Sequence, residues 1–191
     1  MPTPAKTSPD ELVGIALSLI EEGGAGAATI AAVASAAGVK GPSLYKHFAD
    51  RETLLRSAEI AILFELEAVL RKGTKGDSPR ERLWSMAHTY RRWGNRHPHR
   101  YGMIYSKDID KDDELVAACL FAAQPLFEEL KRAGVSDTDV LPLSRTVVAF
   151  LHGFVTMEIA GAFWLGGSVD EAFEAALETI LGPVVSTPRT P

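Results

Sequence analysis

Residues 29–48 read TIAAVASAAGVKGPSLYKHF, two short stretches of helical apolar spacing that meet at Ala37-Gly38-Val39. Thr29 has the side chain of a helix N-cap, and Gly38 permits a sharp turn after the first stretch. The small core expected between the two helices consists of Ile30, Val33, Ala34, Val39, Leu44 and Phe48. This layout predicts a helix-turn-helix, a motif whose second helix enters the major groove of DNA.

The second helix of this pair carries side chains that suit a nucleic-acid surface. Its expected exposed residues are Lys40, Ser43, Tyr45, Lys46 and His47. Their hydroxyl, ammonium and imidazole groups can form hydrogen bonds with phosphates and base edges. Two alternatives stay open here: His47 can cap or pack instead of contacting DNA, and Tyr45 can be half buried.

Helical spacing continues on both sides of this segment, and no two-residue alternation flanked by turn signals predicts a strand. Glycine, proline and capping residues divide the chain into nine predicted helices. Their expected ranges are about 9–23, 30–37, 40–46, 51–71, 79–95, a short helix within 97–106, 112–133, 137–165 and 168–181. The first should begin at a Ser8 N-cap with Pro9 in its first turn. The predicted fold class is all-α.

Composition restricts the class of protein. The chain has 191 residues, of which 46% are hydrophobic and 24% charged, as in a globular protein of one domain or a small module joined to a larger one. The longest apolar run is too short for a membrane span, and the first residues do not read as a signal peptide. One cysteine, Cys119, excludes an intramolecular disulfide and a cysteine-based zinc site. We therefore expect a cytoplasmic protein. The net charge of −5 excludes a globally basic nucleic-acid binder but not a local basic patch.

Several short motifs occur together near the N-terminus. They are Thr29, Ala37-Gly38-Val39, Leu44-Tyr45-x-His47-Phe48 and Glu52-x-Leu54. In this combination the chain resembles the TetR family of bacterial transcription regulators, at the motif level over residues 11–55. The resemblance implies a sequence-specific DNA-binding regulator without enzymatic activity. It also implies a DNA-binding domain at 1–56, an effector-binding and dimerisation domain at 57–185 and a flexible tail at 186–191.

The resemblance also implies which residues contact DNA. They are Thr29, Lys40, Gly41, Pro42, Ser43, Tyr45, Lys46, His47 and Arg51. Thr29, Tyr45, His47 and Arg51 are expected at phosphates, and the others at the groove. The N-terminal arm offers only one basic residue, Lys6, where many family members have several arginines. Residues 1–56 hold five basic and six acidic groups, so we expect a shallow dependence of DNA affinity on salt.

The C-terminal part is expected to form a homodimer that reads a palindromic operator. The predicted helix at 137–165 is apolar nearly all round, so one side should cover the chain's own interior and the other a partner. The expected interface residues are Phe150, Gly153, Phe154, Met157, Gly161, Trp164, Phe173, Leu177 and Ile180. The alternative is a monomer with a fully buried central helix.

Aromatic residues, methionines and a few polar side chains suggest a small-molecule effector site. The expected ligand-binding residues are Trp84, Met86, Tyr90, Trp93, Met103, Tyr105, Phe121, His152 and Thr156. The same stripe also fits an ordinary core. The predicted function is a repressor released from its operator by an effector. The alternatives are a DNA-binding regulator with a filled core and a helical ligand carrier or enzyme.

Other patterns predict structure rather than chemistry. The histidines His88, His97 and His99 have no nearby cysteine and are weak metal ligands as a set. The aspartates between 108 and 113 lack the central glycine and the twelfth-position Glu of a calcium loop, which favours a solvated acidic linker. Cys119 fits a small core residue better than a thiol sensor. No catalytic motif is present, and no metal or cofactor is predicted.

Overall fold

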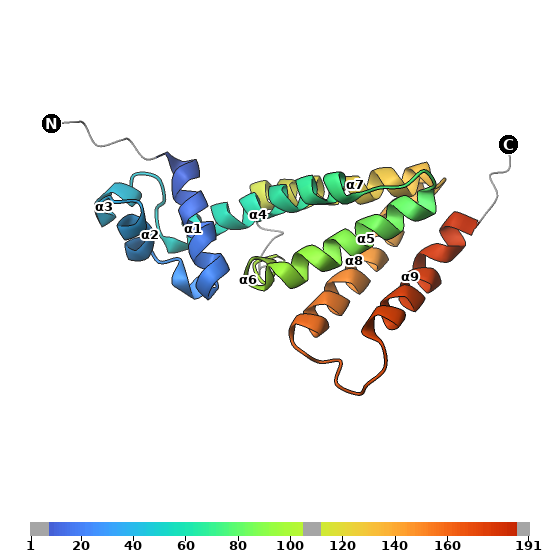
Figure 1. Cartoon of the computed structure of the whole chain (residues 1–191). Helices are drawn as coiled ribbons and strands as arrows, with labels where there is room; N and C mark the ends of the chain where they lie inside the picture. The colour runs from blue at the N-terminus through green and yellow to red at the C-terminus, as the bar shows by residue number, and fades with distance from the viewer. Residues whose placement is uncertain (1–7, 105–111, 187–191) are drawn as a thin grey trace. The chain divides into compact units, whose positions relative to one another are not determined.

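The computed structural model describes residues 8–104 and 112–186, and within these ranges the chain is all-helical, as predicted (Figure 1). The described elements are α1 (Pro9–Gly23), the 3₁₀ turn η1 (Ala25–Ala27), α2 (Ile30–Ala36), α3 (Gly41–Leu44), α4 (Arg51–Gly73), α5 (Pro79–Arg96), α6 (Pro98–Tyr101), α7 (Asp113–Arg132), α8 (Asp137–Ile159) and α9 (Val169–Ser186). Nine α-helices were expected, and the described residues form nine; η1 was not predicted.

These residues form two compact units. The N-terminal unit takes its residues from Met1–Glu65 and His97–Cys119, and the C-terminal unit from Leu66–Arg96 and Leu120–Pro191. This division differs from the predicted domain ranges because α6 packs against α1 and so belongs to the N-terminal unit. Of the predicted tail, Ser186 ends α9, and 187–191 lie outside the described residues.

In the N-terminal unit, local signals set the helix ends as predicted. Ser8 and Glu11 form a capping box, in which the Glu11 amide donates to Ser8 Oγ at 3.2 Å and the Ser8 amide to Glu11 Oε2 at 2.9 Å. Gly38 has a φ of +67° after α2, where the Val39 amide donates to Ala34 O at 2.9 Å. The buried core of this unit consists of Leu12, Ala16, Ile20, Ala28, Val33, Ala34, Leu44, Phe48, Leu54 and Ala58.

In the C-terminal unit, α5 packs against α8 and α9, and one arginine connects all three helices. Arg91 on α5 donates to Glu158 on α8, with Nη2–Oε1 at 2.6 Å and Nε–Oε2 at 2.9 Å. It also pairs with Asp170 on α9 at 2.8 Å, and its guanidinium carbon lies 4.7 Å from the centre of the Phe173 ring. The hydrogen bonds from Arg91 lower the pKa of Glu158.

Two predicted helix ends are wrong. Helix α8 ends at Ile159, not at 165, because Gly161 adopts a φ of +65° and the Ala162 amide donates back to Met157 O at 2.9 Å. Trp164 and Leu165 consequently lie outside the helix. Helix α9 continues past 181 to Ser186, with Pro183 in its last turn, where a missing amide removes one hydrogen bond only.

Helix α3 is also shorter than expected. It spans Gly41–Leu44 rather than 40–46, and the chain continues in a turn in which the amides of His47 and Phe48 donate to Leu44 O at 2.8 and 2.9 Å. This turn keeps Tyr45, Lys46 and His47 close to α3. Tyr45, Lys46 and His47, which were expected on the second helix of the motif, therefore lie in the turn directly after it.

Helix α8 is buried along one face only. Its buried side chains are Val140, Ser144, Val147, Leu151 and Val155. This contradicts the alternative of a fully buried central helix. By length and composition alone α8 is apolar enough to cross a membrane, a property that core helices of soluble proteins share. One face of α8 therefore covers the chain's own interior, and the opposite face is exposed.

Candidate nucleic-acid interface

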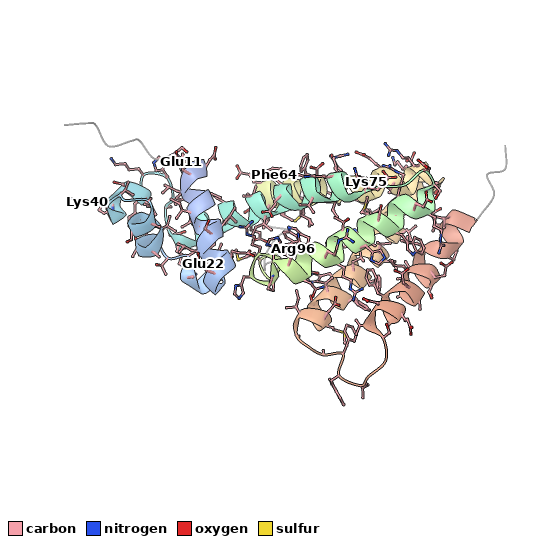
Figure 2. The ribbon with its side chains drawn as sticks, viewed as in Figure 1. Glu11, Glu22, Lys40, Phe64, Lys75 and Arg96 are labelled. Atoms are coloured by element: carbon pink, nitrogen blue, oxygen red, sulfur yellow. The ribbon has the colours of Figure 1, made fainter. Side chains whose placement is uncertain are left out.

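Buried residues hold α3 against the rest of the motif. Leu44 is completely buried, and Phe48 is nearly so, which fixes both ends of the segment 44–48 on the core. Lys40 precedes α3 in an extended conformation, with φ −81° and ψ 146°, and Pro42 stands in the first turn, where no amide donor is required. Figure 2 labels Lys40 at the start of this helix.

The side chains expected at DNA are mostly exposed. Tyr45 is 58% exposed, which excludes the half-buried alternative in this conformation. Lys40, Pro42, Lys46 and His47 are also exposed, and Gly41 and Ser43 are half-buried. The His47 ring lies 6.5 Å from the Phe48 ring, tilted by 56°, so the imidazole stays at the surface beside a buried aromatic residue. The motif thus presents cationic and hydrogen-bonding groups from a rigid support.

Thr29 begins α2 as predicted. Its Oγ1 accepts a hydrogen bond from the Ala32 amide at 3.1 Å, and its carbonyl accepts from the Val33 amide at 3.0 Å. A hydroxyl has one donor in addition to its acceptor lone pairs. Because the cap uses an acceptor, the exposed Thr29 hydroxyl keeps its proton for an outside acceptor such as a phosphate.

Arg51 lies differently from the other expected DNA contacts. Its Nε donates to Ala28 O at 3.1 Å and its Nη2 to Ala25 O, and the side chain is partly buried. These two carbonyls precede α2 by a few residues, whereas Arg51 begins α4. Sequence spacing gave no signal for these bonds, because the partners are 23 and 26 residues away.

Asp50, directly before Arg51, caps α4. Its Oδ1 accepts from the Thr53 amide at 2.8 Å and from Thr53 Oγ1 at 2.9 Å. The bond from the Thr53 amide lowers the pKa of Asp50, so the carboxylate is negative at neutral pH. This charge is bound to the helix N-terminus, where the macrodipole stabilises it.

His97, directly before α6, and His99, within α6, serve the packing of α6 on α1. His97 Nδ1 lies 2.8 Å from Glu21 Oε1, and His99 Nδ1 lies 2.9 Å from Glu21 O. Arg100 lies 3.0 Å from Glu21 Oε2 and donates to Glu65 Oε2 on α4 at 2.7 Å. Within residues 8–104 and 112–186, no group of three or more His, Cys, Asp or Glu could hold a metal ion.

Two further patterns from the sequence have structural roles. Asp112 Oδ1 accepts from the amides of Glu114 and Leu115, both at 3.1 Å, at the start of α7, and Asp112 Oδ2 pairs with Arg56 at 2.6 Å. Asp113 begins α7, and Asp108 and Asp110 lie outside the described residues. Cys119 is half-buried, and burial raises the pKa of its thiol, which favours the unreactive protonated form.

The expected ligand-binding residues differ in burial where the structure describes them. Met86, Tyr90 and Trp93 are core residues, 4%, 6% and 5% exposed. Phe121 and His152 are half-buried, and Thr156 is exposed. Met103 packs against the core of the N-terminal unit, and Tyr105 lies outside the described residues. Trp84 faces α9, where its Nε1 donates to Glu174 Oε2 at 3.0 Å.

One cavity of about 130 Å³ lies in the C-terminal unit, and its wall is charged. It is lined by Arg71, Thr74, Arg82, Met86, Pro125, Glu128, Glu129 and Arg132. Its arginines are paired with carboxylates, as in the Arg82–Glu129 pair at 2.6 Å and the Arg71–Glu128 pair at 2.9 Å. Effector pockets are usually larger and mainly apolar, and only Met86 belongs to the expected set.

The residues expected at the dimer interface fall into two groups. Phe173 and Leu177 are completely buried within the chain, and the rings of Phe150 and Phe154 lie 5.6 and 5.0 Å from Phe173. These four residues therefore build the packing of α8 on α9. The exposed members are Gly153, Met157, Gly161 and Trp164, and Ile180 is half-buried.

An all-helical chain with an exposed recognition helix on a small N-terminal core belongs to the class of helix-turn-helix regulators. Comparison with protein families agrees. The model described as bacterial regulatory proteins, tetR family, matches residues 13–58, and the model described as Tetracyclin repressor-like, C-terminal domain, matches residues 83–180. The chain belongs to the TetR family and is a DNA-binding transcriptional regulator rather than an enzyme.

Individual relatives support this assignment. The chain is 32% identical to the HTH-type transcriptional regulator Rv0681 of Mycobacterium tuberculosis, over 83% of this chain and 73% of that protein. Its fold is similar to that of BioQ, crystallised with its double-stranded DNA operator, with a TM-score of 0.66, 20% identity and coverage of 95% and 99% of the two chains. It is also similar to ActR of Streptomyces coelicolor, crystallised with (S)-DNPA, with a TM-score of 0.71, 17% identity and coverage of 95% and 98%.

Proposed function

We propose that the chain is a repressor that binds a palindromic operator as a homodimer and leaves it when a small-molecule effector binds. The observation that carries the DNA-binding part is the exposure of Tyr45, Lys46 and His47 beside the fully buried Leu44. Rigidly mounted, exposed cationic and hydroxyl groups are suited to phosphates and base edges. As a bacterial regulator that acts on DNA, the protein works in the cytoplasm.

The proposed DNA contacts follow the surface of the motif. They are Thr29, Lys40, Gly41, Pro42, Ser43, Tyr45, Lys46 and His47. Thr29 supplies a phosphate contact from the start of α2 through the hydroxyl proton that its capping bond leaves available. Lys40 and Lys46 supply positive charge on either side of α3. Each lysine that neutralises a phosphate should contribute about 0.9 to the salt slope.

The exposed face of α8 supports a homodimer. Met157 is 46% exposed, and Gly153 and Gly161 on or just after α8 allow close approach of a second helix. Trp164, 78% exposed, extends this apolar surface beyond the end of α8. A symmetric dimer is suited to a palindrome, in which the two recognition helices enter successive major grooves about 34 Å apart.

An effector site is proposed between α5 and α8, around His152 and the buried Met86, Tyr90 and Trp93. Burial lowers the pKa of His152, so its imidazole is neutral at pH 7 and can both donate and accept a hydrogen bond. Because Met86, Tyr90 and Trp93 are buried in this conformation, an effector would have to displace them. Binding would then favour a second conformation, as release from DNA requires.

A regulator without an effector is the second candidate. It is favoured by the burial of the same three side chains, which fill the place where a ligand would lie. The two candidates differ in their response to small molecules. An effector should raise the melting temperature of the purified chain and weaken its operator affinity, because a ligand stabilises the state that it binds.

Selection of genomic DNA fragments by the purified full-length chain tests the DNA-binding proposal. The experiment is run at two salt concentrations beside the double variant Tyr45→Ala, Lys46→Ala. Recovery of a palindromic motif by the native chain, and its loss in the variant, is the expected result. Recovery of the same motif by both proteins would remove Tyr45 and Lys46 from the residues that read the operator.

Screening a compound set by thermal shift, followed by operator titration with each stabilising compound, tests the effector proposal. A compound that raises the melting temperature and weakens operator binding is expected. Stabilising compounds that leave operator affinity unchanged would favour the second candidate.

A further inference from the structure

A single side chain joins the two ends of the helix-turn-helix segment. The guanidinium of Arg51, at the start of α4, donates through Nε to Ala28 O at 3.1 Å and through Nη2 to Ala25 O. Ala25 and Ala28 precede α2, and Arg51 follows the turn after α3. The two hydrogen bonds, named here the Arg51 bridge, therefore close the segment 28–51 on itself.

The carbonyls in this bridge belong to the short segment that leads into α2. This segment begins after Gly24, whose φ is +71°, and passes through η1 to Ala28, which is completely buried. The Thr29 amide then donates to Ala27 O at 2.9 Å. The direction in which Thr29 and the start of α2 face is thus set by the carbonyls that Arg51 binds.

Arg51 binds these carbonyls through Nε and Nη2, which lie on the same edge of its guanidinium. Two hydrogen bonds along one edge fix the plane of a guanidinium, which a single ammonium group cannot reproduce. A phosphate contact, by contrast, needs only positive charge near the DNA backbone, and a lysine can supply it. In the Arg51 bridge, both donors on this edge of the guanidinium bind backbone carbonyls of the protein itself.

We infer that Arg51 is a positioning residue for operator binding: its bridge to Ala25 and Ala28 sets the orientation of Thr29 and α2, and it does not act as a phosphate contact. This inference deepens the proposed function, because it rests on the contact of Thr29 with DNA. It replaces the expectation that Arg51 belongs with Tyr45 and His47 at the phosphates.

Two substitutions separate positioning from charge. Arg51→Lys keeps the positive charge and removes the paired hydrogen bonds of the Arg51 bridge, whereas Arg51→Met removes both the charge and the bridge. Arg56→Met is the matched control, because Arg56 lies on the same helix, carries the same charge and pairs with Asp112 instead of the segment before α2. All four full-length proteins are measured against the duplex recovered by the genomic selection, at several salt concentrations.

For a positioning role, Arg51→Lys and Arg51→Met both weaken operator binding by about tenfold, the size expected for lost hydrogen bonds to a charged group. The slope of log affinity against log salt stays at the native value, and Arg56→Met binds as the native chain does. A native affinity in Arg51→Lys, together with a slope reduced by about 0.9 in Arg51→Met, would identify a phosphate contact and overturn the inference.

Hydrogen exchange of the DNA-free proteins gives a readout that needs no operator. The amides of Thr29, Ala32 and Val33, all hydrogen-bonded at the start of α2, should exchange about tenfold faster in Arg51→Lys, while those in α1 stay unchanged. This result in a chain that selects no operator would retain the bridge but reject the proposed function. Faster exchange throughout the protein, with operator affinity unchanged below the melting temperature, would show a merely structural role and overturn the inference. If Arg51→Met does not fold, Arg51→Lys decides alone.

Discussion

Thr29 uses one hydroxyl group in two ways. Its oxygen accepts from the Ala32 amide, and its proton remains available to DNA. Replacement by serine keeps both functions, whereas replacement by alanine removes both. We expect Thr29→Ala to lower the free energy of unfolding by about 1 kcal/mol, the usual value of an N-cap, and to weaken operator binding as well. Urea denaturation and operator titration of both variants check this, and equal affinity of the two would remove the phosphate contact.

Gly38 is required by the backbone and not by lack of space. Its φ is +67°, yet a Cβ at this position would meet no atom within 4 Å. Gly38→Ala should therefore cost about 1 kcal/mol through the left-handed conformation alone. Gly14, inside α1 and equally open, is the matched control, and Gly14→Ala should stabilise by about 0.5–1 kcal/mol. Urea midpoints that shift in the same direction for both variants would contradict this assignment.

For single residues, the sequence predicts the helix caps and turns, because these depend on residues close by in the chain. Ser8, Thr29 and Gly38 were predicted correctly because capping and turn rules involve residues three or four positions away. The partners of Arg51 were not predicted, because Ala25 and Ala28 offer only backbone carbonyls and leave no mark on the sequence. Met103 was expected at a ligand, but an apolar side chain alone does not show which core it joins.

Among the helices, α5 and α8 are joined by an ion pair that depends on pH. Hydrogen bonding to Arg91 lowers the pKa of Glu158 in the folded state. The resulting stabilisation is complete above the unfolded-state pKa of about 4.3 and is lost as the pH falls through the folded-state pKa. We expect Glu158→Gln to cost about 2 kcal/mol at pH 7 and progressively less as the pH falls through the folded-state pKa of Glu158.

Urea denaturation at several pH values measures this difference. Glu22→Gln is the control, because Glu22 is exposed and has no ion-pair partner among the described residues. Its effect should be small and independent of pH. A constant loss of stability in Glu158→Gln from pH 7 to pH 3 would assign the loss to packing and not to charge.

The ends of α8 and α9 show where pattern alone fails for whole helices. Apolar residues continue from α8 through Trp164, so the pattern extended the helix, but Gly161 ends it by a local backbone change. In α9 the Gly182-Pro183 pair suggested an end, yet the helix continues, with Leu181 and Gly182 buried. In α8 a local glycine conformation ended the helix within an apolar pattern, whereas in α9 the helix continued through a local stop signal.

For the whole molecule, the exposed face of α8 predicts the state of association. Met157→Glu places a charge on that face without changing the chain's own core, because Met157 is already 46% exposed. The native chain should sediment as a dimer and this variant as a monomer with native helix content. Leu120→Glu, on α7 and 55% exposed, is the control and should remain dimeric. A monomeric native chain, or a dimeric Met157→Glu, would place the interface elsewhere.

The N-terminal unit is discontinuous in sequence, which affects how the protein is made. Helix α6 and Met103 pack onto α1 and the motif core, but the stretch 66–96 is synthesised before them. At roughly 5–20 residues per second, the ribosome adds that stretch in about 2–6 s. During this interval the nascent N-terminal unit lacks the contacts of His97 and Arg100 with Glu21. The N-terminal unit of this regulator is thus the first to be translated, but its folding is completed late. A message truncated within α5 would yield an N-terminal unit that lacks the contacts of α6 with α1.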